Sequence, residues 1–252
     1  MESNSLHGQT AVVTGGSQGL GKAIAVALAS AGARLALVAR DRAALDAAAA
    51  EMRGGGAGVE VFPADVSDET QVRQLERDVL ARFERVDILV NNAGINVRCP
   101  VDQFTLEDWN RVIATNLTSA FLMCRSFVPQ MKVRGYGRVL NLTSTMSHVS
   151  IPGRAAYSAS KAGLLGFTKA LALEVASDGV TVVAISPGPF VTGMNAPLLA
   201  DAALNAHFVS RIPAGRWGDV REVGQLALFL CSPDAGFITG TDILIDGGWT
   251  AQ

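Results

Sequence analysis

Short apolar runs alternate with helical stretches along the whole chain, and this alternation restricts the fold more than any other feature. The runs are apolar nearly throughout, which is typical of strands that are covered on both faces. They span residues 10–16, 34–40, 59–66, 86–94, 138–144, 180–188 and 242–248. The helical stretches between them span residues 20–31, 41–53, 68–84, 105–133, 155–178 and 221–231.

Strands that alternate with helices indicate βαβ units, a parallel sheet and right-handed crossovers. The chain has 252 residues and contains no linker, repeat or charge block that would divide it. The sequence therefore predicts an α/β fold over residues 1–252: one doubly wound domain, with a parallel sheet of about seven strands flanked by helices. Ligands of such sheets bind beyond the carboxyl ends of the strands, near the point where the strand order reverses.

The segment 189–215 interrupts this rhythm with a mixture of Pro, Gly, Met and short apolar groups. A long insertion at the ligand edge of an α/β sheet is often a lid or a substrate loop. The same segment fits an additional pair of packing helices, and the two interpretations do not exclude each other.

Composition excludes several classes of partner. The net charge of −2 gives no electrostatic reason to expect nucleic acid or an anionic membrane as a partner. No uncharged apolar run is as long as a membrane span, and "MESNSLHGQT" resembles no secretory signal. The three cysteines are far apart, and neither they nor the histidines show metal-ligand spacing. We expect a cytoplasmic protein without a metal site.

The first glycine-rich segment, "VVTGGSQGLG" (12–21), follows the first strand and begins the first helix. Gly15, Gly19 and Gly21 allow the backbone to turn tightly and to approach a pyrophosphate at the helix N-terminus. Their spacing is G-x3-G-x-G, which differs from the G-x-G-x-x-G of the standard dinucleotide fingerprint. A glycine cluster of this kind is weak evidence by itself.

A second feature is "YSASK" (157–161), where Tyr157 and Lys161 share one face of a predicted helix. Such a pair is usually incidental. Its meaning depends on the other motifs.

Together, TGxxxGxG (14–21), "NNAG" (91–94), "YSASK" and "SPG" (186–188) resemble the short-chain dehydrogenase/reductase family. The resemblance extends from about residue 8 to the C-terminus. It implies a Rossmann-like domain and an oxidoreductase that interconverts a secondary alcohol and a ketone with NAD(P). It also implies a homotetramer that packs the C-terminal region and the helices 105–133 and 155–178 between subunits.

The family's catalytic residues match Asn116, Ser144, Tyr157 and Lys161, with Ser144 thirteen residues before Tyr157. In the family the tyrosine exchanges a proton with the substrate oxygen, and the serine orients that oxygen. The lysine lowers the pKa of the phenol and holds the nicotinamide ribose. The asparagine lies at a helix irregularity and holds a water of the proton relay.

The resemblance also implies a set of cofactor contacts. They are Gly15, Ser17, Gln18, Gly19, Leu20, Gly21, Arg40, Asp65, Val66, Asn91, Ala93, Gly94, Tyr157, Lys161, Pro187, Gly188 and Thr192. Relatives that use NAD carry an acid at the end of the second strand, where this chain has Ala39 followed by Arg40. A guanidinium makes charge-assisted bonds to a phosphate, so NADP(H) is favoured. NAD(H) remains possible because Asp41 follows.

The substrate is less well defined. Several segments resemble gluconate 5-dehydrogenase-like members, which implies a sugar acid or a polyol as the substrate. Arg98 and Arg154 are either cations that meet its carboxylate or charges at the rim of the site. The histidine at 148 is either a pocket residue or a plain loop residue, and Met194 is a further candidate substrate contact. A 3-oxoacyl-carrier-protein reductase or a broad-range ketone reductase would share this core. A non-catalytic NADP-binding regulator is disfavoured because the tyrosine and the lysine are both present.

Overall fold

The computed structural model describes residues 5–252. Seven strands form one parallel sheet in the order β3-β2-β1-β4-β5-β6-β7. The strands are Thr10–Thr14 (β1), Arg34–Ala39 (β2), Val59–Pro63 (β3), Ile88–Asn91 (β4), Gly137–Leu142 (β5), Val180–Pro187 (β6) and Asp242–Ile245 (β7). The predicted doubly wound parallel sheet is confirmed.

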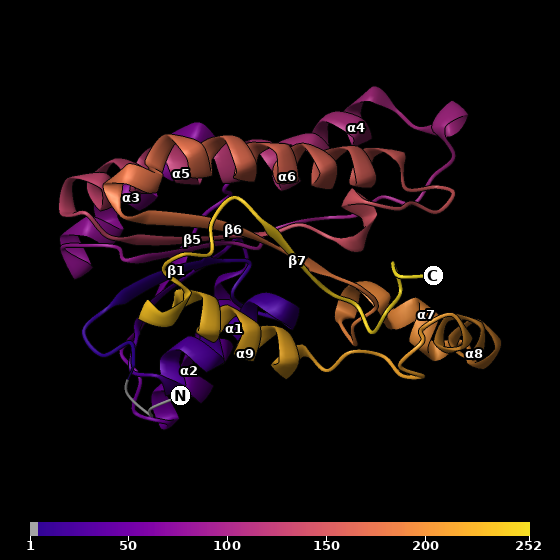
Figure 1. Ribbon diagram of the computed structural model, residues 1–252, viewed down its shortest axis with the longest axis horizontal. Coiled ribbons are helices and arrows are strands. Elements are labelled where there is room, and N and C mark those ends of the chain that lie inside the picture. The colour runs from indigo at the N-terminus through magenta and orange to yellow at the C-terminus, as the bar shows by residue number, and fades with distance from the viewer. Residues whose placement is uncertain (1–4) are drawn as a thin grey trace.

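Helices cover both faces of the sheet (Figure 1). On one face lie α1, α2 and α9, and on the other lie α3, α5 and α6. The α-helices are Gly19–Ser30 (α1), Arg42–Gly54 (α2), Glu69–Phe83 (α3), Leu106–Ile113 (α4), Ser119–Arg134 (α5), Ala155–Val175 (α6), Ala196–Ala200 (α7), Ala202–Ser210 (α8) and Val220–Cys231 (α9). Within residues 5–252, none of the helices is long and apolar enough to cross a membrane.

The central strands are buried on both sides, as their apolar sequences predict. Successive side chains of a strand point to opposite faces of the sheet. Val12 accordingly packs against α3 and α5, and Val13 packs against α1 and α9, and both are fully buried. Two hydrophobic cores therefore enclose the sheet, one on each face.

Polar side chains define where several helices begin. Asp41 accepts a hydrogen bond from the backbone N–H of Ala44 at the start of α2. Asp68 caps α3, and Asp219 forms a capping box with Glu222 at the start of α9. These caps fix the loops from which the helices leave the sheet.

The predicted helix over 105–133 is divided into three parts. Between α4 and α5 lies one π-helical turn, η2 (Ala114–Thr118), which contains Asn116. Single π-turns inside longer helices occur frequently at functional sites. The structure thus shows the irregularity that the resemblance implied at Asn116.

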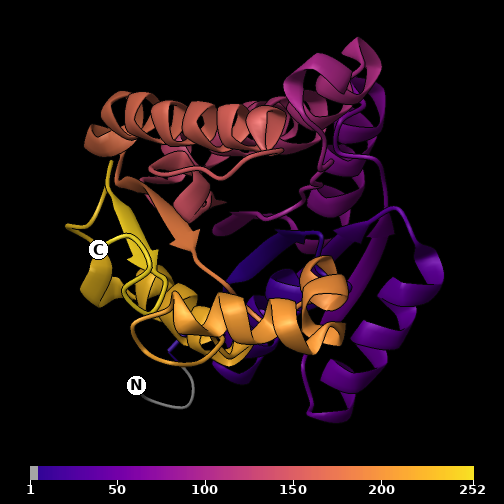
Figure 2. The ribbon, with the colours of Figure 1, turned by 90° about the vertical axis from the view of Figure 1, so that its right-hand side faces the viewer.

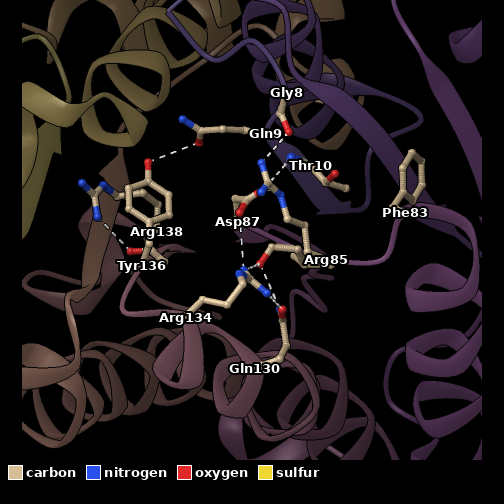
Figure 3. Close-up of polar contacts among 12 residues, drawn as sticks. Gly8, Gln9, Thr10, Phe83, Arg85, Asp87, Gln130, Arg134, Tyr136 and Arg138 are labelled. Atoms are coloured by element: carbon tan, nitrogen blue, oxygen red, sulfur yellow. Dashed lines mark hydrogen bonds and ion pairs between the residues drawn. The ribbon is translucent and has the colours of Figure 1, made fainter.

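The amino-terminal edge of the sheet carries a polar network around Asp87, which precedes β4 (Figure 3). Its carboxylate accepts from the backbone N–H of Thr10 at 2.8 Å and pairs with Arg85 and Arg134. Nearby, the Tyr136 hydroxyl lies 3.2 Å from Gln9. A buried carboxylate needs such partners to offset its desolvation. The network ties β1 to β4 at the edge opposite to the one that the motifs occupy.

The segment 189–215 contains one 3-10 turn, η5 (Gly193–Asn195), followed by α7 and α8. Figure 1 shows these two helices at one end of the molecule, beyond α9, and Figure 2 shows them in the foreground, viewed from that end. The segment thus contains additional helices, as one interpretation of the sequence proposed. Its movement as a lid stays a prediction.

Candidate active site

A cavity of about 640 Å³ opens at the carboxyl ends of the strands. It lies at the point where the strand order reverses, because β1 pairs with β2 on one side and with β4 on the other. The predicted residues that line it are Gly15, Ser17, Gln18, Gly19, Leu20, Arg40, Asp65, Val66, Ala93, Gly94, Ser144, Arg154, Tyr157, Lys161, Pro187, Gly188 and Thr192. One edge of the sheet therefore brings together motifs that are far apart in the sequence.

The glycine-rich turn has no room for a side chain at Gly15 or at Gly21. A Cβ at Gly15 would lie 2.7 Å from Asn92 Nδ2, and a Cβ at Gly21 would lie 2.3 Å from the same atom. Asn92 donates to the carbonyls of Thr14 and Gly15 and holds the turn in place. Gly21 thus packs against Asn92 and the carbonyl of Gly15 and does not line the cavity.

Helix α1 begins in this turn without a side-chain cap from Gln18. Its first N–H groups are therefore available to an anion, and the helix dipole favours negative charge there. Ser17, Gln18 and Gly19 line the adjacent wall. The narrow, uncapped turn fits the pyrophosphate of a dinucleotide.

The end of β2 provides one exposed cation. Arg40 lies 3.9 Å from Asp65, and its side chain is 71% exposed. Asp41 also lines the cavity, but its carboxylate caps α2 through Ala44. Asp41 was the reason that NAD(H) remained possible from the sequence, and its carboxylate therefore already has a hydrogen-bond partner in the structure.

The sequence predicted Asn91 as a cofactor contact, but its side chain lies elsewhere. Its side chain does not line the cavity, because it is buried between the sheet and α5, where its Nδ2 donates to Asn141 Oδ1 at 2.8 Å and contacts Cys124. This bond joins β4 to β5. Asn91 therefore holds together the strands from which the site is built.

Ser144, Tyr157 and Lys161 converge on the cavity from β5 and α6. The hydroxyls of Ser144 and Tyr157 are hydrogen-bonded to each other. Burial raises the pKa of Tyr157, and this hydrogen bond and the positive charge of Arg154 act in the opposite direction. A phenol in this position is protonated at neutral pH and can donate its proton to a bound oxygen.

The ammonium of Lys161 donates to the carbonyl of Leu142 at 2.5 Å and lies 5.8 Å from the centre of the Tyr157 ring. Burial lowers the pKa of Lys161 to about 8. The sequence predicted that this lysine lowers the pKa of the phenol. In the structure, burial raises the pKa of the phenol, and the smaller opposing effects come from Ser144 and Arg154.

Asn116 lies behind this group and does not line the cavity. It is 1% exposed, and its amide bonds Ile95 and Ser160. A Cβ at Gly94 would lie 3.3 Å from Asn116 Oδ1 and 3.6 Å from Lys161 Nζ. The side chain of Asn116 is thus fully used in holding the loop after β4, and Thr115 of the same turn reaches the cavity.

Beyond the tyrosine, two buried polar atoms that line the cavity have no hydrogen-bond partner among the described residues. They are Nη1 of Arg154, whose residue is 9% exposed, and Oδ1 of Asn96. Burial lowers the pKa of Arg154, and the charge of Arg98, which does not line the cavity, lowers it further. An unpaired guanidinium N–H is costly to bury and is satisfied by an anionic or carbonyl ligand.

Two further residues, His148 and Met194, were candidate substrate contacts. His148 does not line the cavity, because its ring is paired with Asp242 at 2.5 Å. The interpretation of this histidine as a pocket residue is therefore wrong. The side chain of Met194 lies outside the described part of the structure.

One wall of the cavity is aromatic, and the sequence did not predict it. Phe208 of α8 stacks between Trp217 and Trp249, with ring centroids 5.9 Å apart in each pair. All three line the cavity. The sequence signal was Phe208 and Trp217, in and beside the insertion, but only the fold brings Trp249 next to them.

Comparisons with known proteins agree with this geometry. A family model described as enoyl-(acyl carrier protein) reductase matches residues 15–250. D-beta-hydroxybutyrate dehydrogenase of Rhizobium meliloti (strain 1021) is 39% identical, with 97% of this chain and 99% of the relative covered. A 3-oxoacyl-[acyl-carrier-protein] reductase of Synechocystis sp. (strain ATCC 27184 / PCC 6803 / Kazusa) is 41% identical, with coverage of 96% and 97%.

Among solved structures, a gluconate 5-dehydrogenase from Burkholderia cenocepacia J2315 in complex with NADP and tartrate is similar, with a TM-score of 0.94 and 35% identity. The match covers 98% of this chain and 97% of that one. The similarity thus extends over nearly the entire length of both chains. The chain belongs to the short-chain dehydrogenase/reductase family, whose members are NAD(P)-binding oxidoreductases that act on alcohols and ketones.

Proposed function

We propose that this enzyme is an NADP(H)-dependent dehydrogenase of a hydroxy acid of the sugar-acid type, with Tyr157 as its general acid/base. The observation that carries the substrate class is the buried, unpartnered Nη1 of Arg154 in the cavity wall beside Tyr157. A carboxylate would satisfy this donor through a charge-assisted hydrogen bond. The oxygen that exchanges a proton with Tyr157 would belong to the same molecule.

The proposed chemistry uses the convergence of Ser144, Tyr157 and Lys161. NADP(H) supplies or accepts the hydride when it is bound. Ser144 orients the substrate oxygen, and Tyr157 donates its proton to that oxygen in ketone reduction and takes it back in alcohol oxidation. Lys161, which is 4% exposed, provides a buried positive charge one turn from the phenol.

Cofactor contacts are proposed for the residues of the glycine-rich turn, for Asp65, Val66, Ala93 and Gly94, and for Pro187, Gly188 and Thr192. Preference for NADP(H) is supported by Arg40 at the end of β2 and by the capping role of Asp41. A guanidinium suits a 2′-phosphate better than a ribose hydroxyl. The solved relative from Burkholderia cenocepacia was also found in complex with NADP.

A panel of ketones with NADPH and NADH tests substrate and cofactor together. It contains 5-keto-D-gluconate, acetoacetate, ethyl acetoacetate, acetoacetyl-CoA and 2-butanone. We expect fastest turnover with a keto acid and NADPH. Fastest turnover of acetoacetyl-CoA would favour the alternative, a 3-oxoacyl reductase, and similar rates for all ketones would indicate a broad-range reductase.

The substitution Arg154→Leu makes this test specific for the carboxylate. It removes a charged hydrogen-bond donor, so KM for the preferred keto acid should rise by about tenfold or more. KM for neutral ethyl acetoacetate should stay unchanged. Arg77→Leu, on the exposed face of α3, is the matched control. An equal effect of Arg154→Leu on the acid and the ester would contradict the acidic substrate.

A homotetramer is also proposed. Large apolar side chains are exposed on the outer helices, including Leu106 of α4, Phe121 of α5 and Leu173 of α6. Phe237 and Leu244, near β7, form a second exposed apolar region. Such surfaces are typical of interfaces between subunits. Light scattering tests the assembly, and a monomer would contradict it.

A further inference from the structure

We propose that Asp242 is a positioning residue that fixes the turn carrying Ser144 by holding both of its ends. The inference rests on the proposed catalytic role of Ser144. It gives a role to His148 and to Asp242, neither of which lines the cavity.

The turn begins at Ser144 and ends at His148. It contains the 3-10 helix η3 (Thr145–Ser147), whose N-cap is Ser144 and whose C-cap is His148. Within it, the Ser144 Oγ accepts from the N–H of Met146 at 3.1 Å. The orientation of the turn therefore determines where the Ser144 hydroxyl meets Tyr157.

One carboxylate is connected to both ends of this turn. At the far end, His148 Nε2 lies 2.5 Å from Asp242 Oδ2. At the near end, the Ser186 hydroxyl lies 2.7 Å from the same Oδ2 and 3.1 Å from the carbonyl oxygen of Ser144. The single proton of the Ser186 hydroxyl is shared between these two acceptors, so Ser186 links Asp242 to the main chain of Ser144 from outside the cavity.

Thr143 completes the network next to the catalytic serine. Its hydroxyl donates to the carbonyl of Ile185 at 2.8 Å and lies 2.9 Å from Ser186 Oγ and 3.3 Å from Asp242 Oδ1. The network therefore joins β5, β6, β7 and η3.

Charge and burial indicate that the His148–Asp242 pair stabilises the turn between Ser144 and His148. The Asp242 side chain is 7% exposed, and a buried carboxylate needs hydrogen bonds or a counter-charge. Within residues 5–252, His148 is the one basic side chain at ion-pair distance from it. The His148 side chain is 35% exposed, so the pair lies at the surface end of the network. Substituting the histidine should loosen the turn without creating a cavity in a core.

The decisive variants are His148→Ala, which removes the donor, and His148→Gln, whose amide can replace Nε2. We expect His148→Ala to lower kcat by about tenfold or more, because small displacements of catalytic groups have effects of this size. KM for NADPH, and its affinity measured by fluorescence titration, should stay unchanged. His148→Gln should recover most of kcat. His7→Ala, at an exposed position outside the network, is the control. Turnover is measured with the fastest ketone of the panel.

A second comparison asks whether the effect passes through Ser144. In a Ser144→Ala background, His148→Ala should cause no further loss of kcat, because residues that act as one unit are not additive. Asp242→Asn should resemble His148→Ala, whereas Asp234→Asn at an exposed site should not change kcat.

The outcomes separate this proposal from the proposed function. Wild-type kcat in His148→Ala would overturn it, as would kcat in His148→Gln that is no better than in His148→Ala. An equal fractional loss in both backgrounds would also overturn it. A Ser144→Ala variant with full activity would instead refute the catalytic role of Ser144 itself.

Discussion

The side chain of Asn116 binds both backbone groups of Ile95. Its Oδ1 accepts from the N–H of Ile95 at 2.8 Å, and its Nδ2 donates to the carbonyl of Ile95 at 2.9 Å. A π-turn places this amide, and the loop that it holds begins directly after Gly94. Asn116 thus holds the loop after β4 by its main chain.

Asn116→Ala should therefore lower stability as well as activity. Two partly buried backbone groups of Ile95 would lose their partners, at a cost of at most about 1–3 kcal/mol for each unsatisfied group. We expect Tm to fall by at least a few degrees. Thermal unfolding of the two proteins checks this, and an unchanged Tm would show that the amide does not support the loop.

Gly21→Ala should disturb the glycine-rich turn. The new Cβ would lie 2.3 Å from both Asn92 Nδ2 and the carbonyl oxygen of Gly15. Since real Cβ atoms do not approach so closely, the turn must shift, and NADPH affinity should fall by about tenfold or more. Gly54→Ala, where the Cβ meets open space, is the matched control. Equal NADPH affinity in both variants, by fluorescence titration, would rule out a close-packed turn.

Arg40→Ala should separate the two cofactors. The guanidinium is 71% exposed and would contact the 2′-phosphate, which NADH lacks. Loss of one charge-assisted bond should raise KM for NADPH by about tenfold and leave KM for NADH nearly unchanged. Steady-state kinetics with both cofactors check this. An equal rise for both would refute the phosphate-binding role.

Lys161→Met should change the pH dependence of stability. Burial lowers the pKa of Lys161 from 10.5 to about 8, so between these pH values the folded protein binds fewer protons than the unfolded chain. Stability contributed by this group therefore rises with pH across that window and is lowest below pH 8. The Tm of Lys161→Met relative to wild type should be highest at pH 7 and fall by a few degrees by pH 10. A difference in Tm that is constant with pH would contradict this.

Much of the site could be predicted because its motifs are local and lie at the ends of strands. "NNAG" and "SPG" follow apolar runs, so a parallel sheet must bring them to one edge. The glycine spacing predicted a turn that has no space for side chains, and the contacts at Gly15 and Gly21 agree.

What the sequence could not reveal depends on contacts across the fold. Asn91 belongs to the "NNAG" motif, but its side chain points to Asn141, on the neighbouring strand. His148 follows Ser144 closely, but its partner Asp242 is 94 residues away. The aromatic wall likewise needs Trp249 to return to α8. Such pairings are set by strand register and helix packing, which local patterns do not contain.

Tyr157→Phe tests the central claim most directly, because it removes one hydroxyl and retains the ring. With NADPH and the best ketone of the panel, kcat should fall by about a hundredfold or more, the size of a lost general acid. NADPH affinity and Tm should stay close to wild type, and Tyr136→Phe, remote from the cavity, should retain activity. Turnover of Tyr157→Phe at the wild-type rate would contradict the assignment of Tyr157 as the proton donor.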